Sequence, residues 1–130
     1  MEYTTISQEE RDDKVAAAII SREQEHYHYQ INIDNYRHIA EQLKALPDEW
    51  PEDIRKFRAL KGQALADAVK GEAFDRASQF SHRDRVRHLL ATEIAEQAKC
   101  ETVHAALCEQ LPAGGRRDAA IKRVQAKQKA

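Results

Sequence analysis

Helix-breaking residues are missing from the first third of the chain. The first proline is Pro47 and the first glycine is Gly62, and the 130 residues include only three prolines and four glycines. A Ser-x-x-Glu capping pattern at 7–10 predicts the start of a helix that runs unbroken to the Leu46–Pro47 boundary. Such a helix would be roughly 58 Å long, whereas a compact chain of this size has a radius of gyration of about 14 Å. The sequence therefore predicts an elongated or a dimeric molecule.

Other absences narrow the functional class. Two cysteines, Cys100 and Cys108, do not make a disulfide framework. No apolar run approaches the roughly 18 residues of a membrane span, and the N-terminus lacks the basic and apolar regions of a signal peptide. The only adjacent glycines are Gly114 and Gly115, and no Gly-x-Ser-x-Gly elbow occurs. We therefore expect a cytoplasmic, non-catalytic protein without a cofactor.

The composition and periodicity that are present favour an all-α fold. Aromatic residues make up 6% of the chain and charged residues 33%, and the apolar residues are largely Ala, Leu and Ile. Apolar stripes of helical period predict a small bundle: a long first helix, a second region over 51–80 in one or more pieces, and a helix over 81–111 begun by a second capping pattern at 81–84. Residues 1–111 are the expected single domain, and residues 112–130 a basic segment that forms a weak helix or a tail.

One segment of the first helix also fits a strand. Residues 26–33 alternate strictly, which would put Tyr27, Tyr29, Ile31 and Ile33 on one face of a strand. The only other strand-like piece is 3–6, and no turn signal brackets the segment. Helix is the favoured interpretation.

Three Glu-x-x-His matches raise a metal hypothesis. They are Glu23–His26, Glu25–His28 and Glu101–His104. In di-metal carboxylate bundles this spacing places two ligands on one helix face, but a bare Glu from each of two further helices is also needed. No helix precedes the first match to supply one, so solvated polar positions are the favoured reading.

A second metal hypothesis involves the cysteines. Cys100, His104 and Cys108 recur every fourth residue and so share one helix face, where zinc would take three ligands. Cysteine is also among the most buried residue types, and core packing is the favoured reading. We predict no metal site.

Histidine and tyrosine concentrate in the middle of the first helix. Such amphipathic rings suit half-wet contacts between proteins, although packed rings on an ordinary helix surface explain them too. The predicted contact residues for a protein partner, or for a second copy in a homodimer, are Arg22, His26, Tyr27, Tyr29, Ile33 and Tyr36.

Charge supports an alternative from another class. The net charge is −1, yet residues 1–13 are acidic and residues 112–130 are basic, a pattern that suits solvated helix ends or self-association through opposite ends. A further basic cluster spans 76–88. A nucleic-acid-associated regulator would use these bases on phosphates. The predicted residues are Arg83, Arg87, Arg116, Arg117, Lys122 and Arg123.

The favoured function is thus an interaction or regulatory protein of the bacterial or phage accessory type. The nucleic-acid regulator is the alternative, and a metal-binding bundle comes third.

Overall fold

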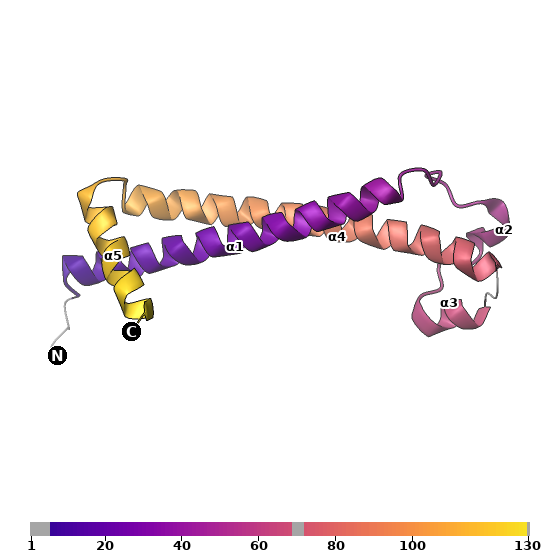
Figure 1. Cartoon of the computed structure of the whole chain (residues 1–130), viewed down its shortest axis with the longest axis horizontal. Helices are drawn as coiled ribbons and strands as arrows, with labels where there is room; N and C mark the ends of the chain where they lie inside the picture. The colour runs from indigo at the N-terminus through magenta and orange to yellow at the C-terminus, as the bar shows by residue number, and fades with distance from the viewer. Residues whose placement is uncertain (1–5, 69–71, 130) are drawn as a thin grey trace, which may run out of the picture. The chain divides into compact units, whose positions relative to one another are not determined.

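The chain is all-α, as predicted. The computed structural model describes residues 6–68 and 72–129, and these contain helices but no strand. The helices are α1 (Gln8–Gln42), α2 (Glu52–Arg55), α3 (Gly62–Ala68), α4 (Glu72–Gln110) and α5 (Gly115–Lys129) (Figure 1). They divide between two compact units: unit 1 is Met1–Ile31 with Ile94–Ala130, and unit 2 is Asn32–Glu93.

Helix α1 is continuous through the segment that also fitted a strand, so the helix prediction for 26–33 is confirmed. Its start uses the predicted cap: Ser7 Oγ accepts the Glu10 N–H at 3.1 Å and the Ser7 carbonyl accepts the Arg11 N–H at 3.0 Å. The helix ends at Gln42, before the predicted boundary, and a turn in which Leu46 N–H bonds the Leu43 carbonyl leads to Pro47. The strand-like piece at 3–6 falls almost wholly outside the described residues.

Helix α4 begins earlier than predicted. The capping pattern at 81–84 predicted a start there, but α4 already begins at Glu72. The pattern lies inside the helix. Ala77 and Phe80, about one and two turns after Glu72, are buried in the core of unit 2, and this packing favours helix before residue 81. The C-terminal end agrees with the prediction, since α4 stops at Gln110, two residues before Pro112.

Unit 1 is built from the first part of α1, the last part of α4, and α5. The two long helices run antiparallel: the Cys100 thiol donates to the Arg22 carbonyl at 3.1 Å, and the Gln97 amide donates to Gln30 Oε1 at 2.9 Å. Helix α5 lies across α1 (Figure 1). The buried core consists of Ala16 and Ile19 of α1, Leu111 directly after α4, and Ala120 and Val124 of α5. Leu107 and Cys108 of α4 pack against it.

The basic C-terminal segment is a helix held onto α1 by charge as well as by apolar contact. Gly114 precedes it with a φ of +150°, which favours glycine. Arg116 donates two hydrogen bonds, of 3.0 and 2.8 Å, to the Asp12 carboxylate, and Arg123 donates one to Asp13 at 2.7 Å. The hydrogen bond from Arg116 is the main reason that the pKa of Asp12 is lowered.

Unit 2 has a separate core around the only tryptophan. Trp50 and Ile54 pack against Ala77 and Phe80 of α4, with the Trp50 and Phe80 ring centroids 5.7 Å apart. Leu46, Phe57 and Leu60 cover this cluster. In this unit too, α1 and α4 meet, since Asn32 donates to Glu93 at 3.4 Å.

Candidate functional site

The six residues predicted to bind a partner do not form one surface. Tyr27 is 64% exposed and Ile33 is 1% exposed, so Ile33 packs inside and offers nothing to a partner. The other four residues are half-buried. Tyr27 and Tyr29 are two positions apart on a helix and therefore point about 200° apart around α1. Only the face that carries Tyr27 remains a candidate contact surface.

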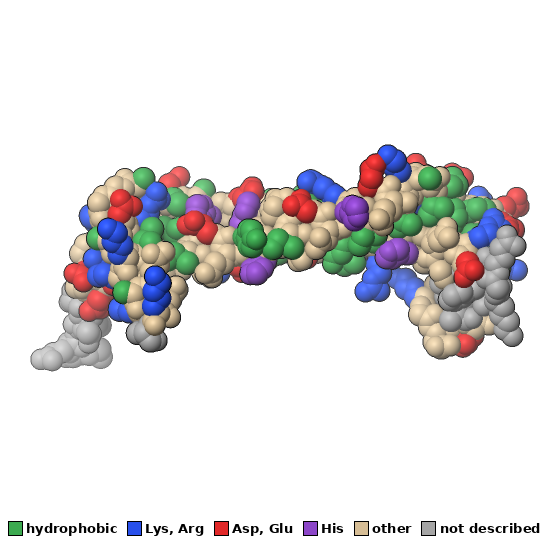
Figure 2. All heavy atoms as spheres, in the orientation of Figure 1, with side chains coloured by type: hydrophobic (Ala, Val, Ile, Leu, Met, Phe, Trp, Pro, Cys, Tyr) green, Lys and Arg blue, Asp and Glu red, His purple; other side chains and the backbone are tan. Residues whose placement is uncertain are grey.

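That face borders a groove between α1 and α5. The groove has a volume of about 710 Å³ and lies entirely within unit 1. Its apolar lining is Ile20 and Tyr27 from α1 with Ile121 from α5. Ile31, one helical turn beyond Tyr27, is 39% exposed. Figure 2 shows hydrophobic and histidine atoms together on the surface over α1. The lining is completed by Glu23, Gln24, His28 and Gln125.

The half-buried Arg22 belongs to the α1–α4 contact instead. Its Nε lies 3.0 Å from Glu25 Oε2, but this N–H points at no acceptor among the described residues, so the contact is an ion pair without a hydrogen bond. Its carbonyl accepts the buried Cys100 thiol. Burial, reinforced by the Glu25 carboxylate, raises the pKa of that thiol. Arg22 thus contacts α4 through its backbone carbonyl, whereas its side chain pairs within α1.

Two of the three Glu-x-x-His matches face each other. His26 Nε2 lies 2.8 Å from Glu101 Oε1, and His104 Nε2 lies 3.6 Å from Glu23 Oε1, so each motif pairs crosswise with the other. The four side chains line a cleft of about 380 Å³ in unit 1. A carboxylate beside an imidazole fixes its tautomer and orientation, and these pairs link α1 to α4. The spacing in the sequence identified both motifs, but their crossed pairing depends on the register of the two helices.

The predicted cysteine–histidine face separates in the structure. Cys108 Sγ lies 3.8 Å from both ring nitrogens of His104, whereas the Cys100 thiol points at the backbone of α1. Both cysteines are free. Within residues 6–68 and 72–129, no three His, Cys, Asp or Glu side chains are grouped so as to hold a metal ion.

Most of the bases predicted to contact nucleic acid are engaged within the chain. Arg83 is 2% exposed and donates to the carbonyls of Pro47 and Asp48 and to the carboxylate of Asp84. Arg87 pairs with Asp48 at 3.1 Å. In unit 1, Arg116 and Arg123 pair with acids of α1, as described above, while Arg117 is half-buried and Lys122 exposed.

A cationic cleft in unit 2 was not found from the sequence. It has a volume of about 410 Å³ and gathers exposed bases from two segments around Trp50. The basic cluster over 76–88 was the only signal of this cleft in the sequence. The remaining bases of the cleft come from the segment 58–62, where the helical periodicity gave no indication of a binding site. The basic side chains in the lining are Arg58, Lys61, Arg85 and His88.

Comparisons with known proteins add no evidence on function to these observations. No family model, curated protein or solved structure matches the chain. Among the helices that the structure describes, none combines the length and apolar character needed to cross a membrane.

Proposed function

We propose that this chain is a non-catalytic interaction or regulatory protein that binds a protein partner through the Tyr27 face of α1. The observation that carries the proposal is the 64% exposure of Tyr27, with the exposed Ile31 one turn away on the same face. Exposed aromatic and apolar side chains that adjoin one another mark interaction sites more often than isolated ones do. Tyrosine in particular is enriched at protein interfaces.

The groove beside Tyr27 supplies the shape such a contact needs. Ile20 and Ile121 give it apolar lining from two helices, and Gln24 and His28 add hydrogen-bonding groups to the same lining. An apolar centre with a polar border is the usual anatomy of a protein interface. A side chain of the partner would fill the groove and cover Tyr27. A second copy of this chain is one partner of that chemistry.

A reducing compartment fits the same reading. Both cysteines are free thiols, and disulfides are rare in the cytoplasm. We infer a cytoplasmic location, which fractionation of the native cell would test.

The decisive experiment compares two substitutions of exposed apolar residues in unit 1. Tyr27→Glu places a charge on the proposed face, and Val103→Glu places one at a 45% exposed residue of α4 that does not line the groove. Tagged wild-type, Tyr27→Glu and Val103→Glu chains are purified from the native cell, and the bound proteins are quantified by mass spectrometry. We expect one partner, or the untagged chain itself, to be recovered with the wild type and with Val103→Glu but lost with Tyr27→Glu.

Two measurements make that comparison interpretable. Equal thermal unfolding of the three chains shows that the loss is not a loss of folding. Light scattering of the purified chain separates a second copy from a foreign partner, because only self-association raises the mass with concentration. Equal recovery of every partner by wild type and Tyr27→Glu would contradict the proposed surface.

A further inference from the structure

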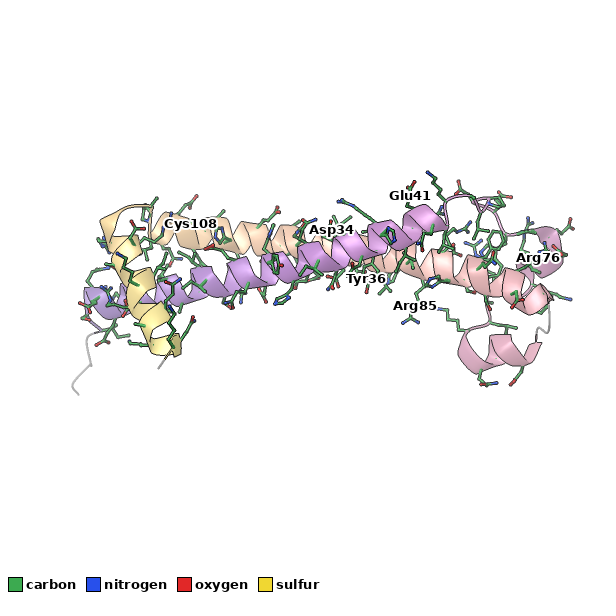
Figure 3. The ribbon with its side chains drawn as sticks, viewed as in Figure 1. Asp34, Tyr36, Glu41, Arg76, Arg85 and Cys108 are labelled. Carbon is green, nitrogen blue, oxygen red and sulfur yellow. The ribbon has the colours of Figure 1, made fainter. Side chains whose placement is uncertain are left out.

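The cationic cleft of unit 2 is independent of the proposed partner surface. The segment after α2 contributes Arg58, Leu60 and Lys61, and α4 contributes Ser81, Asp84, Arg85 and His88. Trp50 also lines the cleft, and its indole N–H donates to Asp84 of α4. Figure 3 shows the Arg85 side chain extending off the α4 ribbon. The cleft therefore joins bases that lie more than twenty positions apart in the sequence.

The one carboxylate in the described lining does not neutralise these bases. Asp84 Oδ1 accepts two hydrogen bonds from Arg83, at 3.1 and 2.8 Å, and Asp84 Oδ2 accepts the Trp50 indole N–H at 2.9 Å. Desolvation by burial raises the pKa of Asp84, but the hydrogen bonds from Arg83 and Trp50 outweigh it and the pKa is lowered overall. Its negative charge is thus matched mainly by the buried Arg83, with a smaller electrostatic contribution from Arg58.

The remaining charge is positive. Arg58, Lys61 and Arg85 are exposed, and among the described residues none of the three makes an ion pair or a side-chain hydrogen bond. Three cations around one concave surface raise the local concentration of anions. Arginine adds a planar fork of donors that matches phosphate geometry, and lysine adds a point charge. These three bases, of which Arg58 alone interacts electrostatically with the Asp84 carboxylate of the lining, define an anion site.

We propose that this cleft binds a phosphate-bearing small molecule, with Arg58, Lys61 and Arg85 contacting the phosphate oxygens. Its volume of about 410 Å³ lies within the range of small-molecule sites and leaves room for more than a single phosphate group. Leu60 and Trp50 in the lining give the apolar contact that an organic moiety beside the phosphate requires. Inorganic pyrophosphate tests the charge recognition alone, and ATP tests it with an organic group attached.

The test uses the full chain and isothermal titration calorimetry at constant ionic strength, because exposed charges are screened by salt. Trp50 is the only tryptophan, so its fluorescence reports whether binding occurs at this cleft. The variant is the double substitution Lys61→Gln and Arg85→Gln. The matched control is Arg37→Gln, which removes one exposed base from α1 in the same unit and outside the cleft.

We expect one molecule of pyrophosphate or ATP to bind per chain, with a change in tryptophan fluorescence that saturates in parallel. The double variant weakens binding by about tenfold or more, because charged hydrogen bonds are lost, and Arg37→Gln leaves it within about twofold. Absence of saturable heat up to millimolar ligand would overturn the proposal. Equal weakening by Arg37→Gln would also overturn it, since attraction would then reflect net charge. Binding of a short oligonucleotide but of neither small molecule would replace it with a nucleic-acid surface.

Discussion

Arg83 is a buried cation that ties the 47–48 segment to α4 in unit 2, and Arg83→Ala tests its contribution to stability directly. Arg83 is 2% exposed and its guanidinium joins two segments: it donates to the carbonyls of Pro47 and Asp48, after α1, and to the carboxylate of Asp84 in α4. It also lies 5.0 Å above the ring of Phe80. The alanine variant removes every one of these contacts and leaves the acceptors without their donor.

The expected loss of unfolding free energy is large for one residue. The Asp84 side chain is 35% exposed, so the loss comes mainly from the hydrogen bonds of the buried guanidinium. Hydrogen bonds that involve a charged group contribute about 1.5–3 kcal/mol each, and the alanine variant also leaves the carbonyls of Pro47 and Asp48 without their donor. The lost contact with Phe80 adds about 1 kcal/mol in a desolvated position. We therefore expect Arg83→Ala to destabilise unit 2 by about 4 kcal/mol. Arg83→Lys keeps the charge but loses the fork of donors, and should cost about half as much.

Urea unfolding followed by the fluorescence of Trp50 measures this, because Trp50 lies in the same core. The matched control is Arg87→Ala, one turn further along α4, whose ion pair with Asp48 joins groups that are 49% and 86% exposed. An exposed pair contributes about 0–1 kcal/mol, so this variant should unfold nearly as the wild type does. If Arg83→Ala and Arg87→Ala lost the same stability, or if Arg83→Ala lost less than about 1 kcal/mol, the structural role assigned to Arg83 would be refuted.

Three further predictions concern unit 1. Ile19→Ala, in a fully packed core position, should lower the unfolding free energy by about 2–5 kcal/mol in chemical denaturation followed by circular dichroism. The hydrogen bond from Arg116 lowers the pKa of Asp12. The ionised Asp12 therefore stabilises the fold above the ordinary carboxyl pKa of about 4, and this stabilisation is lost as the pH falls through the lowered pKa. Asp12→Asn should accordingly reduce the loss of stability on the acid side of a stability–pH profile. Thiol labelling should modify the partly exposed Cys108 before the buried Cys100, whose pKa is raised, so Cys108→Ser removes the fast phase and Cys100→Ser keeps it.

The helices could be predicted from the sequence where local signals govern them. The Ser7 cap and the absence of proline and glycine place α1, and Pro112 places the end of α4. The start of α4 could not be predicted from its local pattern, since a capping pattern at Ser81 is indistinguishable in sequence from the same residues inside a helix. The helix continues through this position because Phe80 is buried against Trp50, and such a tertiary contact cannot be read from local helix propensity.

The candidate surface could be predicted only in part. The concentration of aromatic residues in α1 drew attention to Tyr27 and Tyr29 together, but on a helix these two residues lie on different faces. Which face is buried depends on how α4 and α5 pack against α1. In a strand, Tyr27 and Tyr29 would share one face, because side chains alternate with a period of two residues. The period of the secondary structure therefore decides which residues share a surface, and the composition alone does not. The crossed pairing of the two Glu-x-x-His motifs likewise depends on the register between α1 and α4. Neither motif by itself predicts that register.

The opposite charges at the two ends of the chain gain an explanation within one molecule. In sequence, an acidic start and a basic end favoured solvated termini, with association between copies as the alternative. In the structure Asp12 pairs with Arg116, and Asp13 pairs with Arg123, so these charges attach α5 to α1. Charge already satisfied within the chain gives little drive for binding a second copy. Recognition of a partner by unit 1 should then depend on apolar contact, which is the chemistry that Tyr27 leaves exposed.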